Sequence, residues 1–189
     1  MSEHPQIETL RRAAHERDAD TLQFTLKQVF QKLDFVVALG IAAEQAYRYV
    51  DTFEQYHPEE VWPRRMLMLI VTTATAPERQ IIEEAFKHFE TPGSANFIKA
   101  MYDLYQGTQE TNQSQARLGF LVSAVVNAIT AELVELYFGK RPEQWTAYRA
   151  QAENAPQIAM DFWTNEAVSQ QDTKRWLAVA DAVEKRLDR

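Results

Sequence analysis

The sequence contains no cysteine, and its 189 residues include only five glycines and seven prolines. Without cysteine the chain has no disulfide, no thiolate metal site and no cysteine nucleophile. The scarcity of glycine and proline, beside abundant Glu, Gln, Ala, Leu and Arg, favours helices. The lack of cysteine also fits a reducing compartment, and the first residues have no signal-peptide pattern. We therefore expect a cytoplasmic protein.

The sequence also lacks an uncharged run of the roughly 20 apolar residues that cross a bilayer. The longest such run, Leu118 to Ala131, lies between Arg117 and Glu132. The formal net charge is -7, which on average repels phosphate backbones. Pairs of adjacent basic residues are dispersed along the chain rather than gathered in one segment. These features predict neither a membrane nor a nucleic acid as a partner.

Hydrophobic residues make up 46% of the chain and recur every three to four positions along most of it. This spacing places them on one face of a helix. Side chains that cap helices precede several of these segments. Helices are therefore predicted to begin near Asp18 or Asp20, Trp62, Thr75 and Ser94, with a last helix after Ser169 and Asp172. Asp34 either caps a new helix or lies inside a continuing one.

The strongest helix prediction covers residues 115–138, where an apolar stripe runs without interruption. The stripe contains Leu118, Leu121, Val122, Val125, Ile129, Leu133 and Leu136. We expect this helix at the centre of the protein. Short connections favour antiparallel neighbours, and no linker or internal repeat divides the chain. The sequence therefore predicts an all-α fold, a compact bundle of about seven to nine helices around residues 115–138, in a single domain over residues 1–189.

Glu44 and Glu132 interrupt two of the apolar stripes, and a charge in such a place requires a partner or a function. Arg48 follows Glu44 by four residues, a spacing that allows an ion pair. Tyr47 lies on the helix of Glu44, and Asn127 lies on the helix of Glu132. If the two helices face each other, these five residues would line a polar pocket for a small, mostly apolar ligand. The alternative is a buried ion pair with a structural role only.

An aromatic face formed by Tyr49, Phe53 and Tyr56 is a second candidate site. It lies roughly opposite Tyr47 and Val50, so this helix is apolar on two sides. Either both sides pack inside the bundle, or the tyrosine-rich side binds a partner protein or a second copy of the chain. The second interpretation rests on the enrichment of aromatic residues at interfaces.

Support for an enzyme is weak. Glu54 and His57 have the Glu-x-x-His spacing of metal-carboxylate bundles, but the sequence contains no second such motif. Phosphate-binding glycine loops and nucleophile turns are also missing. We therefore expect no catalytic residue, no metal and no cofactor. Three functions remain: first a non-enzymatic protein acting through protein-protein interaction or self-association, then a regulatory or carrier domain for a mostly apolar small molecule, then a metal-carboxylate enzyme.

Overall fold

The computed structural model describes residues 4–73, 90–109, 114–151 and 161–188. These residues form helices and turns and contain no strand, which confirms the expected all-α fold. Eight helices are bounded within them: α1 (Pro5–Glu16), α2 (Ala19–Phe30), α3 (Phe35–Tyr56), α4 (Trp62–Thr73), α6 (Ser94–Gln109), α7 (Ser114–Phe138), α8 (Pro142–Gln151) and α10 (Glu166–Leu187).

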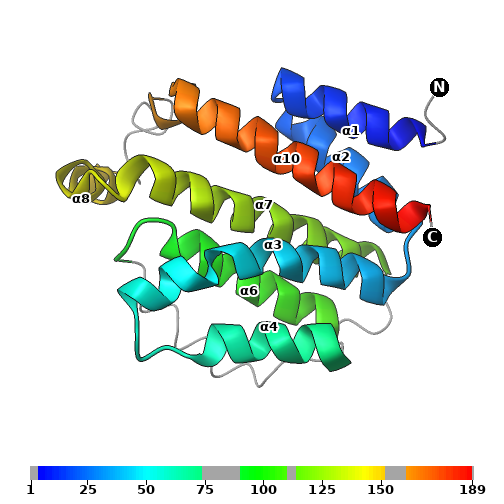
Figure 1. Ribbon diagram of the computed structural model, residues 1–189, viewed down its shortest axis with the longest axis horizontal. Coiled ribbons are helices and arrows are strands. Elements are labelled where there is room, and N and C mark those ends of the chain that lie inside the picture. The colour runs from blue at the N-terminus through cyan, green and yellow to red at the C-terminus, as the bar shows by residue number, and fades with distance from the viewer. Residues whose placement is uncertain (1–3, 74–89, 110–113, 152–160, 189) are drawn as a thin grey trace.

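The helix α7 occupies the centre of the bundle, as the sequence predicts. It contacts α2, α3, α6, α8 and α10, while α1 and α4 pack on helices that contact it. Figure 1 shows α1, α2 and α10 on one side of α7, and α3, α6 and α4 on the other. The described ends of the chain meet at one end of the bundle, where His4 Nε2 lies 2.9 Å from Asp188 Oδ1.

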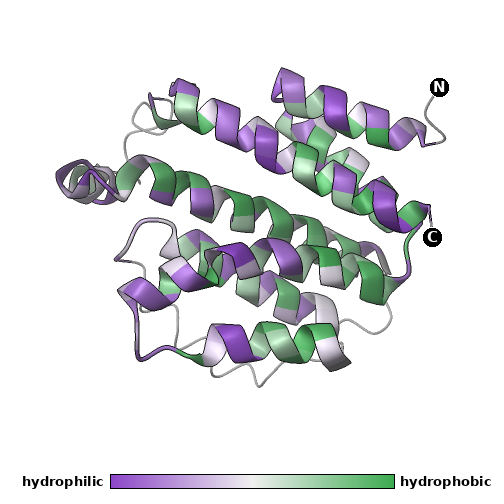
Figure 2. Ribbon diagram, in the orientation of Figure 1, coloured by the Kyte–Doolittle hydropathy of each residue, from purple (hydrophilic) through white to green (hydrophobic). Residues whose placement is uncertain are grey.

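The apolar side chains of α7 form much of the core, and Figure 2 shows this helix as hydrophobic along most of its length. Leu121, Val125 and Leu133 are fully buried. Leu136 is 48% exposed, so the expected stripe is wrong at its last member. Near its C-terminus α7 is covered instead on the side of Phe138, whose ring packs on Trp145 and other aromatic rings.

Among the described residues, α7 is the one helix that is long and apolar enough to cross a membrane, over Gln115–Phe138. More than half of its most apolar part is buried against the rest of the protein. The core helix of a soluble protein has the same length and composition, because it too is surrounded by apolar side chains. The burial of α7 fits that role.

Capping side chains fix where several helices begin. Asp18, one of the two aspartates considered for α2, accepts a hydrogen bond from the backbone N–H of Thr21. Asp34 accepts one from Val36, so of its two alternatives it caps a new helix, α3. The last helix begins earlier than predicted, because Asn165 caps it. Asp172 therefore lies inside α10. The helix predicted to begin near Thr75 lies outside the described residues.

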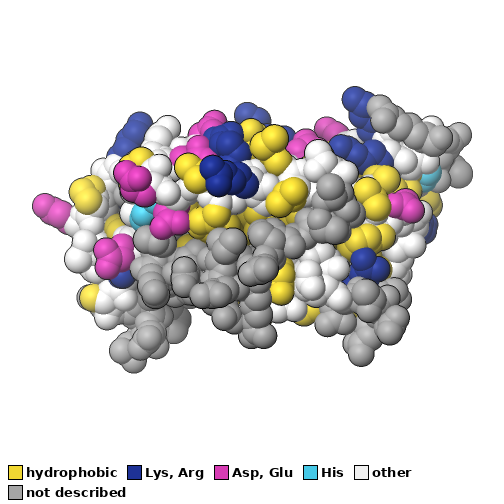
Figure 3. Space-filling view, turned by 90° about the horizontal axis from the view of Figure 1, so that it is seen from below, with side chains coloured by type: hydrophobic (Ala, Val, Ile, Leu, Met, Phe, Trp, Pro, Cys, Tyr) yellow, Lys and Arg dark blue, Asp and Glu magenta, His cyan; other side chains and the backbone are white. Residues whose placement is uncertain are grey.

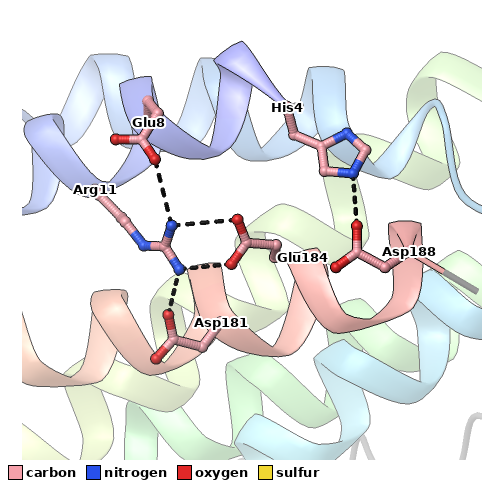
Figure 4. Close-up of polar contacts among 6 residues, drawn as sticks. All are labelled: His4, Glu8, Arg11, Asp181, Glu184 and Asp188. Carbon is pink, nitrogen blue, oxygen red and sulfur yellow. Dashed lines mark hydrogen bonds and ion pairs between the residues drawn. The ribbon is translucent and has the colours of Figure 1, made fainter. Parts of the chain in front are cut away.

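A cluster of carboxylates around Arg11 joins α1 and α10 on one side of the bundle. Arg11 of α1 forms ion pairs with Asp181 and Glu184 of α10, at 2.7 and 2.8 Å, and lies 3.5 Å from Glu8. Figure 4 shows these contacts beside the His4–Asp188 pair. Because α1 packs on both α2 and α10, the cluster adds polar contacts to one side of that packing.

Candidate ligand-binding site

Glu132, one of the five predicted ligand-binding residues, forms an ion pair with an arginine that sequence analysis missed. Arg175 Nη2 donates to Glu132 Oε1 at 2.8 Å and to Gln45 Oε1 at 3.1 Å. The residue Arg175 is only 4% exposed. Burial raises the pKa of Glu132 and lowers that of Arg175, while the charge of each partner acts in the opposite direction. The three side chains thus join α3, α7 and α10 within the bundle.

The ion pair predicted between Glu44 and Arg48 is wrong. Glu44 instead pairs with Arg186 of α10, at 3.2 Å. Glu44 and Arg48 are both exposed. Because α10 packs beside α3, Arg186 reaches Glu44. The spacing of residues within α3 alone could not predict this contact. Arg48 acts on Glu132 and Arg175 through its charge alone. The two glutamates therefore converge on arginines of α10 and not on a shared ligand pocket.

Asn127 belongs to a separate polar cluster between α6 and α7, centred on the fully buried Asp103. Ser123 Oγ donates to one carboxylate oxygen of Asp103 at 2.7 Å, and Lys99 pairs with the other oxygen. Asn127 Nδ2 donates to the Ser123 carbonyl at 2.9 Å. Because both oxygens of Asp103 have partners, this cluster is a closed structural network.

The predicted aromatic interface is corrected by burial. Tyr49 is 1% and Phe53 0% exposed, because α6 covers this side of α3 and places Phe97 against both rings, at 5.3 and 5.0 Å between centroids. The Tyr49 hydroxyl donates to the Pro92 carbonyl. Tyr56 is partly exposed and donates to Glu135 at 3.0 Å. The alternative of core packing therefore describes Tyr49 and Phe53.

The Glu-x-x-His pair is engaged in other contacts. Arg64 donates to both oxygens of Glu54, at 2.9 and 2.6 Å. His57 Nε2 lies 3.1 Å from Thr91 Oγ1. Within the described ranges, no three His, Asp or Glu side chains converge as metal ligands would. These contacts explain the two residues as links from α3 to its neighbours.

A cavity of about 470 Å³ lies where the turn between α1 and α2 meets α7 and α10. We call it the tryptophan cavity, because Trp163 and Trp176 form part of its wall. Apolar side chains from α2 and α7 complete much of the lining: Leu22, Val126 and Ile129. Its volume is within the range of roughly 300–1,000 Å³ that is typical of small-molecule sites.

Two charged side chains reach the tryptophan cavity from different elements. Asp172 of α10 is half-buried, and Arg17 comes from the turn that follows α1. Burial raises the pKa of Asp172, whereas the charge of Arg17 and a hydrogen bond from Trp176 lower it. The guanidinium of Arg17 donates to the Trp163 carbonyl at 2.6 Å. The cavity therefore combines a mostly apolar lining with one carboxylate, one guanidinium and the uncharged polar side chains of Gln23 and Thr130.

Sequence analysis included none of the residues that line this cavity in its candidate site. The sequence predicts that the last helix begins after Asp172. With that start, Asp172 is not expected on the same helix face as Trp176, one turn later. A carboxylate four residues before a tryptophan on an otherwise apolar helix face is the signal that a correct helix start would have provided. Arg175 lies four and eight residues before the buried Val179 and Val183, so the same spacing would have placed Arg175 on the buried face of the helix.

A smaller cavity, of about 340 Å³, lies between α3, α4 and the end of α10. It brings together two of the predicted ligand-binding residues, Glu44 and Tyr47, with Arg186. The rest of its wall is apolar: Gly40, Ala43, Leu67 and Val71. Its two charged side chains are already paired with each other, so it offers a ligand fewer free polar groups than the tryptophan cavity.

Comparisons with family models, with curated proteins and with solved structures found no match to this chain. The fold and the site define it as an all-α bundle with an amphipathic cavity between helices.

Proposed function

We propose that this protein is a cytoplasmic regulatory or carrier domain that binds a small, mostly apolar molecule in the tryptophan cavity. The supporting observation is the lining of a volume of about 470 Å³: two indoles and four aliphatic side chains form most of it, beside two uncharged polar side chains, Gln23 and Thr130, and two charged ones. Ligand sites in proteins combine these same features, since apolar contacts provide affinity and a few polar groups fix orientation.

The tryptophan cavity is also held in place before any ligand enters. Trp163 is tied to the α1–α2 turn through Arg17, and Trp176 is bonded to Asp172 within α10. The cluster around Arg11 keeps α1 on α10. A preformed site loses less conformational entropy on binding, so more of the contact energy appears as affinity.

Thermal unfolding against a panel of small apolar compounds tests this function. A compound at 100 times its Kd stabilises the folded state by about 2.7 kcal/mol, which corresponds to a rise in Tm of roughly 5–11 °C for a chain of this size. The quenching or shift of tryptophan fluorescence gives a second readout. The absence of any stabilising compound would count against a binding function.

Two matched variants locate the binding site. Ala19→Leu adds a large side chain at an exposed position that lines the tryptophan cavity. Gly40→Leu adds a large side chain to the wall of the smaller cavity, where nothing lies within 4 Å of the added Cβ. We expect the rise in Tm to disappear in Ala19→Leu and to persist in Gly40→Leu. The opposite pattern would assign the ligand to the smaller cavity.

Self-association remains a second candidate function, and the outer side of α4 favours it. Met68, Leu69 and Val71 are 60%, 43% and 61% exposed. Figure 3, which views the molecule from the side on which α4 lies, shows hydrophobic side chains on this face. Adjacent exposed apolar side chains of this kind are typical of contact surfaces.

Light scattering over a range of protein concentrations tests self-association. We expect a dimer that Met68→Glu dissociates. Phe24→Glu is the matched control, because Phe24 is 64% exposed on α2, away from α4. A molar mass that stays at the monomer value at every concentration would eliminate this candidate.

A further inference from the structure

Arg17 adopts a backbone conformation that an arginine rarely adopts. It follows the last residue of α1 with φ of 58°, and it is the only residue other than glycine with a positive φ in the described part of the chain. Glycine usually occupies this position at a helix end, because a side chain there is strained. Strained residues of this kind cluster at ligand-binding sites, so the conformation of Arg17 draws attention to the contacts of its side chain.

The Arg17 side chain retains most of its hydrogen-bonding capacity beside the tryptophan cavity. A guanidinium carries five N–H donors, and Arg17 uses one on Nη2 for the bond to the Trp163 carbonyl. The carboxylate of Asp172 accepts from Trp176 and has further lone pairs. In the residues that the structure describes, Arg17 and Asp172 act on each other through charge, without a direct ion pair. One cavity therefore presents a separate cation and anion.

We propose that the ligand of the tryptophan cavity is a small zwitterion with an apolar body, such as an α-amino acid with an apolar side chain; this rests on the proposed binding function. Asp172 pairs with the ammonium group, and Arg17 pairs with the carboxylate. The apolar body packs on Trp163 and Trp176, where the ammonium group also gains from the indole faces.

Ligands of other charge leave one of the two groups unpaired. A neutral apolar ligand would bury Asp172 further and give it no cation beyond its bond from Trp176, which is unfavourable for a carboxylate. A simple amine would pair with Asp172 but place a second positive charge near Arg17. A simple acid would pair with Arg17 but repel Asp172. A zwitterion gives each of the two groups a partner of opposite charge.

Calorimetric titration with matched compounds tests the inference. The probes are L-leucine, L-methionine, L-phenylalanine and L-tryptophan, their decarboxylated amines, their deaminated acids, and neutral apolar compounds of similar size. We expect at least one amino acid to bind about tenfold or more tightly than its amine and its acid, since each analogue lacks one charge-assisted contact. Ala19→Leu should abolish that binding, because it fills the cavity.

Variants of the two charged residues separate a ligand contact from a structural role. Asp172→Asn and Arg17→Gln should each weaken amino-acid binding about tenfold, and Arg17→Gln should also remove the preference for the amino acid over its amine. Arg12→Gln, an exposed position on α1 that does not line the cavity, is the control. Arg17→Gly should also weaken binding, because it removes the guanidinium from the cavity while it relieves the left-handed backbone.

The outcomes distinguish this inference from the function on which it rests. If neutral compounds bind the cavity more tightly than every amino acid, the zwitterion is wrong and the binding function stands. If no compound of any class binds at millimolar concentration, both proposals fail. Arg17→Gly that binds amino acids like the unaltered protein would also overturn the role of Arg17.

Discussion

Replacement of Glu132 by leucine should destabilise the protein by about 3 kcal/mol, because it leaves a buried guanidinium without its anion. Arg175 is 4% exposed, and Gln45 would be its remaining acceptor among the contacts of Nη2. Breaking a buried pair by removal of one partner costs about 3–5 kcal/mol. The Glu132 side chain is 21% exposed, so the lower end of that range applies.

The reverse replacement, Arg175→Met, should cost less, about 1–2 kcal/mol. The carboxylate of Glu132 still faces solvent in part and the charge of Arg48, and its raised pKa eases protonation. The double variant Glu132→Leu/Arg175→Met removes both charges and the desolvation that opposes each of them. It should be more stable than Glu132→Leu by about 2 kcal/mol, since apolar replacement of a buried pair is often neutral.

Urea unfolding of the four proteins measures these differences, with thermal unfolding as a second readout. A loss of 3 kcal/mol should lower Tm by roughly 6–12 °C in a chain of this size. Unchanged m-values would show that the denatured state is not altered. A Glu132→Leu variant within about 1 kcal/mol of the unaltered protein, or a double variant less stable than both single variants, would refute the assignment of Arg175 as a buried charge that depends on Glu132.

Three further predictions concern Asp172 and two glycines. Burial raises the pKa of Asp172 in the folded state above its ordinary 3.8. The folded protein therefore loses stability as pH rises from 3.8 through the raised pKa, because the unfolded chain gives up the proton more easily. Asp172→Asn should lack this loss and so gain stability relative to the unaltered protein between acidic and neutral pH, as measured by urea unfolding at each pH. Gly40→Ala should add about 0.5–1 kcal/mol, since nothing lies within 4 Å of the new Cβ. Gly93→Ala should cost more than about 2 kcal/mol, because φ is +81° and the Cβ would meet Ala131 and Tyr49; equal Tm values for the two alanine variants would contradict both glycine predictions.

The helices and much of the core could be predicted because they depend on residues close in sequence. The three-to-four-residue spacing of apolar side chains and the caps at Asp18 and Asp34 involve contacts within one turn. The error at the start of α10 is also local: Asn165 competes with Ser169 as a cap, and both residue types suit that position. Its consequence was not local, since it removed Asp172 from consideration.

The polar partners could not be predicted, because they come from distant parts of the chain. Gln45 and Arg175 are separated by 130 residues, and Arg17 and Trp163 by 146. The spacing of Tyr49 and Phe53 shows that a helix side is apolar, but not whether α6 or a partner covers it. Only the packing of helices decides that, and periodicity within one helix carries no information about it.

Two groups of charged side chains in the described part of the chain differ in how they are paired, and this difference supports the proposed site. Asp103 and Arg175 are more deeply buried than Asp172, yet side chains of the same bundle bind them directly. Arg17 and Asp172 face a cavity without direct pairing, and one of them also has a strained backbone. Unfavourable local features that the fold itself does not require tend to gather where a protein binds something. Their coincidence at the tryptophan cavity, and not at the smaller cavity whose charges are paired, is the physical reason to look for the ligand there.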